Sequence, residues 1–320
     1  MGASSRQEEI FDRQARFCDS RSPFYAGLCR RLAGDPRVAA IAPDLRWDLP
    51  LRLLGGLHYL VLGGRASWDG VDEALDGEHE FLARFVRRQS VQTNEVRRAW
   101  GLLPAFLSLD AGHVDLIELG ASAGLLLALD RYDYRYRAGS WGSGAGVLVL
   151  DGDDRGGPPA GVLERQLDVG RRIGLDLDPV GLGEEGARLL EAFVWPDQRE
   201  RIERLRHAIE IARTCDIDLR RGDYVDLLPA VLRQRRDDTL TVVFHSVSTT
   251  YLDDERYAAL VAALRRAGDD GPLAWVSFEG PRHDPDYGAV ALDVTRWPGG
   301  ETRRLARVDF HAAWLEWGGR

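Results

Sequence analysis

Two glycines lie four residues apart in the middle of the chain, after a short apolar run that contains an acidic residue. The segment reads Asp115-Leu-Ile-Glu118-Leu-Gly120-Ala121-Ser122-Ala-Gly124. Gly120 permits a tight turn with no Cβ to block a ligand, and Gly124 lets the following helix pack closely. The first N–H groups of that helix can bind a carboxylate, and Glu118 can accept a hydrogen bond from an ammonium group. This pattern is typical of loops that bind S-adenosylmethionine, with Ala121 and Ser122 as further contacts.

The same loop also fits a second pattern, Gly-x-Ser-x-Gly, in which Ser122 would be the nucleophile of an α/β-hydrolase. Both motifs lie between a strand and a helix, so the local context does not separate them. A hydrolase usually has several strands before this turn, whereas the residues before this loop have helical spacing. The acid and histidine of a triad would come from Asp223 or Asp253 and from His283 or His311. A purely structural glycine turn is the third interpretation.

Acidic residues follow the next two segments that we expect to be strands. Asp176 and Asp178 close the second strand, where nucleoside-binding sheets place an acid that takes both ribose hydroxyls. A solvated strand end is the alternative. Asp223 and Tyr224 follow the third strand, and an aspartate beside an aromatic ring suits the amino group and ring of adenine. Asp223 can also cap the next helix, and the two roles are compatible.

The fourth expected strand ends in His245 and Ser246, and the fifth ends in Glu279. A histidine at the carboxyl end of a buried strand is expected to face the crevice and to titrate near neutral pH, although a structural histidine has the same pattern. Either His245 or Glu279 is a candidate to accept a proton from a substrate. The ring of Tyr251 is a candidate to stabilise a cation. We therefore predict these three as catalytic residues, and Ser246 and His245 as cofactor contacts.

The elements that position these residues change in character near residue 110. Before it, apolar residues recur at helical spacing, as in Phe81, Leu82, Phe85 and Val86. After it, apolar runs alternate with helical segments, which indicates a parallel sheet with crossover connections. The expected strands are Val114–Leu119, Arg172–Leu177, Ile217–Arg220, Leu240–His245 and Leu273–Phe278.

Two alternating runs, Ala289–Arg296 and Arg303–Asp309, predict an antiparallel hairpin at the end of the chain. Residues 132–151 alternate around a Gly/Ser-rich centre and predict a β-hairpin insertion before the second core strand. Five strands linked by crossovers and followed by a hairpin are the order of a class I methyltransferase sheet. We therefore predict an α/β protein, with a helical N-terminal cap or lid at residues 1–110 and a Rossmann-like domain at residues 111–320.

The composition of the chain argues against several classes of binding partner. The formal net charge is −9 and the basic residues are spread out, which argues against a nucleic-acid duplex. Every basic side chain is arginine, so lysine chemistry is excluded. No stretch reaches the roughly 18–20 apolar residues of a membrane span, and the first residues lack the layout of a signal peptide. We expect a cytoplasmic, S-adenosylmethionine-dependent transferase that transfers a methyl group to a small molecule. The alternatives are an α/β-hydrolase-type esterase with Ser122 as nucleophile and a non-catalytic S-adenosylmethionine-binding protein. Neither the substrate nor the oligomeric state is specified.

Cys18, Cys29 and Cys215 are widely separated and have no metal-ligand spacing. The sequence therefore predicts neither a disulfide framework nor a metal site.

Several short motifs together resemble a bacterial family catalogued as domain of unknown function 2332. They extend over most of the chain: 91–95 (VQTNE), 118–125 with 130–132 (DRY), 174–179 (GLDLDP), 195–198 (WPDQ), 221–223 (RGD), 245–252 and 297–300 (WPGG). The family looks like a class I methyltransferase fold with a helical cap. Where its pattern has an asparagine after the glycine loop, this chain has Leu126, so a polar ligand contact is lost.

The resemblance also draws attention to Gln92, Asn94 and Glu95. These polar side chains precede an amphipathic helix, and we expect them to reach over the cofactor loop and contact substrate. The alternative is that Thr93 or Asn94 caps the helix.

Overall fold

The computed structural model describes residues 3–282 and 288–318. The chain forms two compact units, Met1–Asn94 with Leu182–Arg206 and Glu95–Gly181 with His207–Arg320. This division differs from the predicted boundary at residue 110 in two ways. The helix α7 (Arg98–Ser108) belongs to the second unit, because its apolar residues pack on the sheet. The segment Leu182–Arg206, expected in the sheet domain, belongs to the first unit.

The first unit is built from helices around one apolar core that includes Phe11, Leu32 and Leu53. Gly55 and Gly56 lie inside the apolar helix α4 (Leu49–Leu62) and do not interrupt it. A Cβ on Gly55 would crowd Phe193, and a Cβ on Gly56 would crowd Phe85. At both glycines a neighbouring aromatic side chain therefore packs directly against the helix. The helices are α1 (Ala3–Cys18), α2 (Pro23–Leu32), α3 (Pro36–Ile41), α4 (Leu49–Leu62), α5 (Val71–Gly77), α6 (His79–Arg88), α9 (Glu184–Ala192) and the start of α10 (Arg199–Ala212).

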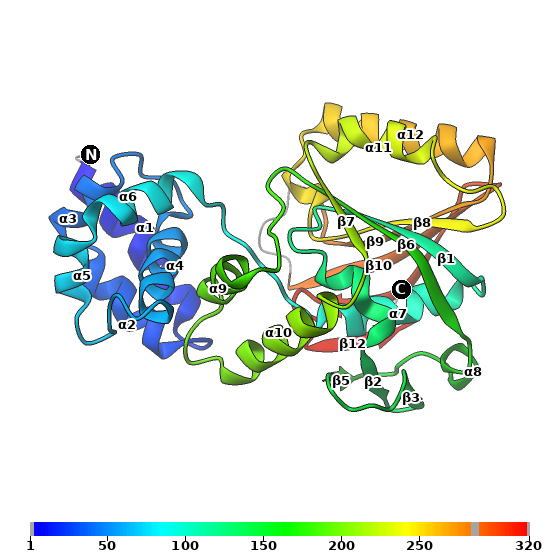
Figure 1. Ribbon diagram of the computed structural model, residues 1–320, viewed down its shortest axis with the longest axis horizontal. Helices are drawn as coiled ribbons and strands as arrows, with labels where there is room; N and C mark the ends of the chain where they lie inside the picture. The colour runs from blue at the N-terminus through cyan, green and yellow to red at the C-terminus, as the bar shows by residue number, and fades with distance from the viewer. Residues whose placement is uncertain (1–2, 283–287, 319–320) are drawn as a thin grey trace. The chain divides into compact units, whose positions relative to one another are not determined.

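The second unit contains a sheet in which nine strands of the described residues are paired in the order β5-β12-β11-β10-β9-β8-β1-β6-β7 (Figure 1). The five strands from β9 to β7 are parallel, and each was predicted from the sequence. The hairpin of β10 and β11 continues the sheet antiparallel to β9, as predicted. The strands are β1 (Gly112–Leu119), β6 (Leu167–Asp176), β7 (Ile217–Arg221), β8 (Leu240–Ser246), β9 (Leu273–Glu279), β10 (Ala289–Trp297), β11 (Glu301–Asp309), β12 (Trp314–Trp317) and β5 (Asp153–Asp154).

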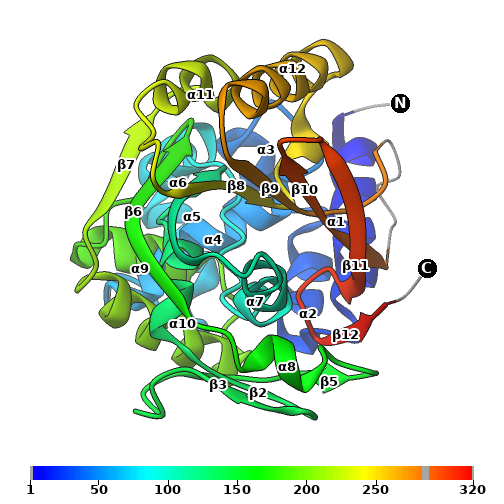
Figure 2. The ribbon, with the colours of Figure 1, turned by 90° about the vertical axis from the view of Figure 1, so that its right-hand side faces the viewer.

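Helices cover both faces of this sheet. Figure 2 shows α11 (Tyr224–Leu232) and α12 (Asp254–Asp270) on one face and α7 on the other. The 3₁₀ helix η1 (Leu125–Arg131) follows the glycine loop and packs with α7, β1 and β6. Side chains at alternate positions of the central strands, such as Ile117 and Val243, fill the layer under α11 and α12. The chain is thus an α/β protein with a mostly parallel sheet and a helical N-terminal part.

Three features differ from the expectation or add to it. The predicted helix after the glycine loop is a 3₁₀ helix, with non-helical backbone angles at Ala128. The predicted insertion forms a hairpin of β2 (Asp133–Tyr136) and β3 (Gly139–Trp141), to which β4 (Val149–Leu150) adds, and the short helix α8 (Ala160–Leu163) follows. The strands β12 and β5 at one end of the sheet were not predicted.

Among the described residues, no helix combines the length and the apolar composition needed to cross a membrane.

Candidate functional site

The strand order reverses beside β1, which has β6 and β7 on one side and β8 and β9 on the other. In open parallel sheets, ligands bind outside the carboxyl ends of the strands at such a reversal. The structure brings the predicted strand-end residues to this edge: Glu118 on β1, Asp176 on β6, Ser246 on β8 and Glu279 on β9. Most of the predicted site residues therefore lie along one edge of the sheet.

The glycine loop leaves β1 at this edge in a conformation that favours glycine. Gly120 and Gly124 have φ angles of +75° and +71°. A Cβ on Gly120 would lie 2.8 Å from both Cβ and Oγ of Ser248, and one on Gly124 would lie 3.0 Å from Cγ2 of Ile217. The loop therefore packs closely against β7 and against the turn after β8, and a side chain at either glycine would clash there.

Asp176 holds the loop through its backbone. One carboxylate oxygen accepts a hydrogen bond from the N–H of Ser122 at 2.8 Å, and the other accepts from the N–H of Asp178 at 2.8 Å. Ser122 itself has a φ of +50°. Each oxygen of a carboxylate can accept a second hydrogen bond, so both remain able to receive a ligand hydroxyl. Asp178 turns outward to an ion pair with Arg221 at 2.5 Å.

Glu118 is a buried carboxyl group beside this loop, with 3% of its surface exposed. Its Oε2 has no hydrogen-bond partner among the described residues. Burial raises the pKa of Glu118 well above its ordinary value, the nearby Asp176 raises it further, and Arg98 opposes the shift. This carboxyl group therefore holds a proton, or another cation, more strongly than an ordinary glutamate does.

Ser246 lies on the same face of the sheet as Glu118. Glu118 pairs with Phe244 across β1 and β8, and side chains two residues apart point to the same side. The hydroxyl of Ser246 is also buried without a partner among the described residues. Arg98 of α7 donates to the carbonyl oxygen of Ser246 at 3.2 Å, and its guanidinium carbon lies 4.7 Å from the centre of the Phe310 ring. Within the part of the chain that the structure describes, this face therefore holds two buried polar atoms that lack a hydrogen-bond partner.

His245 and Glu279 lie on the opposite face. His245 pairs with Ser277, two residues before Glu279, and its Nδ1 is 3.4 Å from Oε2 of Glu279. The ring is completely buried and packs 5.7 Å from that of Trp275. His245 was expected to face the crevice; the register of β8 instead turns its side chain into the layer under α12, where it is completely buried.

Glu279 holds the turn that follows β8. Its Oε2 accepts from the N–H of Ser248 at 3.0 Å and from the N–H and Oγ1 of Thr249, both at 2.9 Å. Burial would raise the pKa of Glu279, but contact with His245 and the bonds from Thr249 and Ser248 outweigh it and lower the pKa below its ordinary value. Glu279 is therefore an ionised anchor.

The turn held by Glu279 contains a strained residue. Val247 has a φ of +53°, a region that β-branched residues avoid at a cost of about 1–3 kcal/mol. This conformation brings Ser248 against Gly120 and within 3.3 Å of the Tyr224 hydroxyl. Burial raises the pKa of Tyr224 to about 12. The turn thus joins the ends of β8 and β9 to the glycine loop and α11.

Asp223 and Asp253, for which the sequence offered more than one role, cap helices. Asp223 accepts from the N–H of Val225 at 2.8 Å at the start of α11 and pairs with Arg256. Asp253, an alternative triad acid, caps α12. The helix-capping alternative for Asp223 is therefore confirmed. His283, an alternative triad histidine, lies outside the described residues, and Tyr251 is 77% exposed next to the turn.

The residues predicted as a lid fall at the boundary between the two units, with Gln92 and Asn94 in the first and Glu95 in the second. The alternative that Thr93 or Asn94 caps the following helix is wrong, because α7 begins only after Arg97. Glu95 instead accepts from the N–H of Arg97 at 3.1 Å. Their role as a lid stays a prediction.

Two residues of the site were missed in the sequence. Arg98 reads as part of an amphipathic helix, and no local pattern connects it to β8. Ser248 was a detectable candidate, since serines on both sides of Val247 directly after a buried strand are a turn signal.

The chain belongs to the bacterial family described as "Uncharacterized protein conserved in bacteria (DUF2332)", which matches residues 8–317. No curated protein matches it.

Proposed function

We propose that this member of the DUF2332 family is an S-adenosylmethionine-dependent transferase that methylates a small molecule. The fold we infer is Rossmann-like, of the class I methyltransferase type. The central strand order β7-β6-β1-β8-β9 supports this, because it is the 3-2-1-4-5 order of nucleotide-binding sheets. The glycine loop at the reversal supports it further.

The observation that carries the proposal is the buried oxygen of Glu118 that has no hydrogen-bond partner in residues 3–282 and 288–318. Leaving a buried polar atom unpaired costs about 1–3 kcal/mol, which a bound donor would offset. The amino-acid part of S-adenosylmethionine offers an ammonium donor of the right charge. Ser246 offers a second polar atom on the same face.

The other residues suit the remaining parts of the cofactor. Asp176 would receive the ribose hydroxyls with its free lone pairs, and Tyr224 and Asp223 at the start of α11 would border the adenine. Ala121, Ser122 and the two glycines would form the floor of the site. Asp178 would act only through its pair with Arg221.

Bound S-adenosylmethionine supplies an electrophilic methyl group on a sulfonium with a good leaving group. The protein therefore needs mainly to align the acceptor and exclude water. We assign His245 and Glu279 to positioning, since both are buried and together they hold the turn against the loop. Tyr251 is the exposed aromatic residue that remains to contact an acceptor or the sulfonium.

The test is calorimetric titration with S-adenosylmethionine, S-adenosylhomocysteine and methylthioadenosine, which lacks the amino-acid part. Glu118→Gln should weaken the first two at least tenfold and leave methylthioadenosine unchanged, since a charged hydrogen bond contributes about 1.5–3 kcal/mol. Glu301→Gln, at an exposed position of β11, is the matched control. Gly120→Val should abolish binding of all three.

Two results would contradict cofactor binding through Glu118. One is no binding of any of the three compounds by the folded wild-type protein; labelling of Ser122 by a fluorophosphonate would then favour a hydrolase. The other is binding that Glu118→Gln leaves unchanged. Tight binding without methyl transfer to any compound of a metabolite panel would indicate a non-catalytic binding protein.

A further inference from the structure

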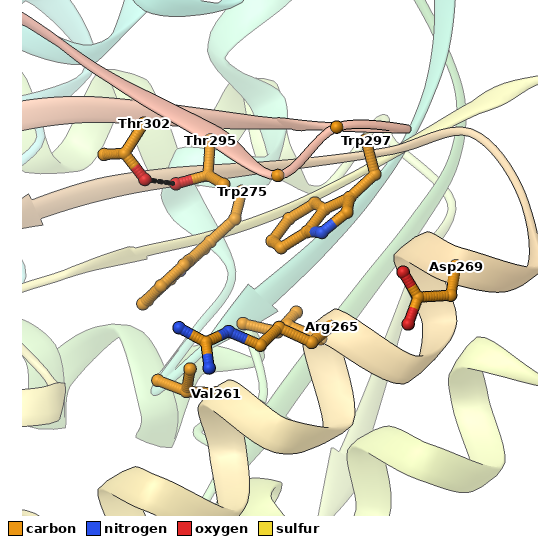
Figure 3. A pocket seen from close by; sticks show the side chains of 10 residues that line it. Val261, Arg265, Asp269, Trp275, Thr295, Trp297 and Thr302 are labelled. Carbon is orange, nitrogen blue, oxygen red and sulfur yellow. Dashed lines mark hydrogen bonds between the residues drawn. The ribbon is translucent and has the colours of Figure 1, made fainter.

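A pocket of about 400 Å³ lies in the second unit between α12 and the strands β9, β10 and β11 (Figure 3). This volume is within the range of small-molecule sites. The pocket lies toward the amino end of β9: Trp275, in its wall, precedes Glu279 by four residues, about 13 Å along a strand. It is therefore distinct from the edge that carries the glycine loop.

Two indole rings form the walls of the pocket. Trp297 is 6% exposed, and the ring of Trp275 packs against the ring of His245, with 5.7 Å between their centres. The indole N–H of Trp275 is buried and has no hydrogen-bond partner among the described residues. Across the hairpin, the hydroxyls of Thr295 and Thr302 bond to each other at 2.7 Å. Aromatic walls of this kind favour a flat, apolar occupant.

One cation reaches into this space. Figure 3 shows the guanidinium of Arg265 extending from α12 toward the Trp275 ring and away from Asp269. Within the part of the chain that the structure describes, Arg265 forms neither an ion pair nor a hydrogen bond, although Asp269 is one helical turn away. Its five N–H donors match the geometry of a carboxylate.

We propose that this pocket binds a planar aromatic carboxylate, with its ring between the indoles and its carboxylate on Arg265. The aromatic ring of the ligand gains contact area against Trp275 and Trp297. The positive charge of Arg265 favours an anion over a neutral compound of equal size. Asp269 at the other end of the pocket disfavours a second negative charge. This inference does not depend on the function proposed for the glycine loop.

The test uses 2-naphthoate, its neutral analogue 2-naphthamide, and the non-aromatic cyclohexanecarboxylate, each titrated by calorimetry and by saturation-transfer NMR. Saturable binding of 2-naphthoate is expected, with weaker binding of the other two. Arg265→Gln should weaken 2-naphthoate about fivefold, as an exposed charge pair contributes up to about 1 kcal/mol. Asp269→Asn should tighten it, and Trp275→Leu should abolish it.

Arg266→Gln is the matched control, because Arg266 is exposed on the same helix and does not line the pocket. It should leave the affinity unchanged. The proposal is overturned if 2-naphthoate fails to bind the folded protein, if 2-naphthamide binds equally well, or if Arg265→Gln and Arg266→Gln have the same effect. Binding that survives Trp275→Leu would place the compound elsewhere and would equally overturn it.

Discussion

The imidazole of His245 and the carboxylate of Glu279 lie side by side in the buried layer under α12, with Nδ1 3.4 Å from Oε2. The same oxygen of Glu279 accepts two backbone N–H groups and one hydroxyl from the turn after β8. The pair therefore links the end of β9 to the turn that touches Gly120. The His245–Glu279 pair therefore holds the turn after β8 against the glycine loop.

Glu279→Gln should lower the free energy of unfolding at pH 7 by about 2–4 kcal/mol, because it weakens several charge-assisted hydrogen bonds. The pKa of Glu279 is lowered on folding, so its stabilisation is complete above the ordinary value of 4.5 and is lost as the pH falls through the folded-state value. Urea unfolding from pH 3 to 8 measures this. If the wild type and the variant lose stability equally below pH 4.5, the carboxylate is not an anchor.

Glu118 should show the opposite pH dependence. Its pKa is raised on folding, so between the ordinary value of 4.5 and the higher folded value the native state retains a proton that the unfolded state has lost. Its contribution therefore destabilises the protein progressively as the pH rises. Glu118→Gln should be more stable than the wild type at pH 8, by about 1–3 kcal/mol, and equal to it near pH 4. A constant difference at all pH values would contradict the assignment.

Asp130→Ala should destabilise the protein by about 3–5 kcal/mol. Asp130 and Arg172 form a buried ion pair at 2.6 Å, with side chains that are 5% and 4% exposed, and Arg172 also donates to the carbonyl oxygen of Leu127. Removal of the carboxylate takes away the counter-ion of this buried guanidinium, which keeps its bonds to backbone carbonyl oxygens. Thermal unfolding measures the loss. The exposed pair of Asp153 and Arg155 provides the control, and Asp153→Ala should cost at most about 1 kcal/mol.

The three cysteines should differ in their reaction with a thiol reagent such as DTNB. Cys215 is half-buried, whereas Cys18 and Cys29 are fully buried and their thiols contact each other in the first unit. One thiol should react rapidly in the native protein and three in denaturant. Cys215→Ser should remove the rapid phase. Rapid reaction of two or three thiols in the native protein would show that the core of the first unit opens readily.

The sequence by itself determined the strands that carry the site. Apolar runs of strand length between helical segments predicted all five parallel strands and the hairpin, because alternation and chain punctuation are local properties. The loop from Gly120 to Gly124 was also a local prediction, and its positive φ angles bear out the need for glycine. The residues at the strand ends followed from the topology of a parallel sheet.

Only the tertiary structure decided which residues act together. The register of β8 places His245 on one face and Ser246 on the other, and this register is set by pairing with β1, more than a hundred residues away, and with β9. Arg98 reaches Ser246 across 148 residues, and Glu279 reaches Ser248 across 31. The helix α7 joined the sheet and Leu182–Arg206 joined the helical unit for the same reason: apolar faces are buried against whichever partner the whole chain brings near, and no local pattern names that partner.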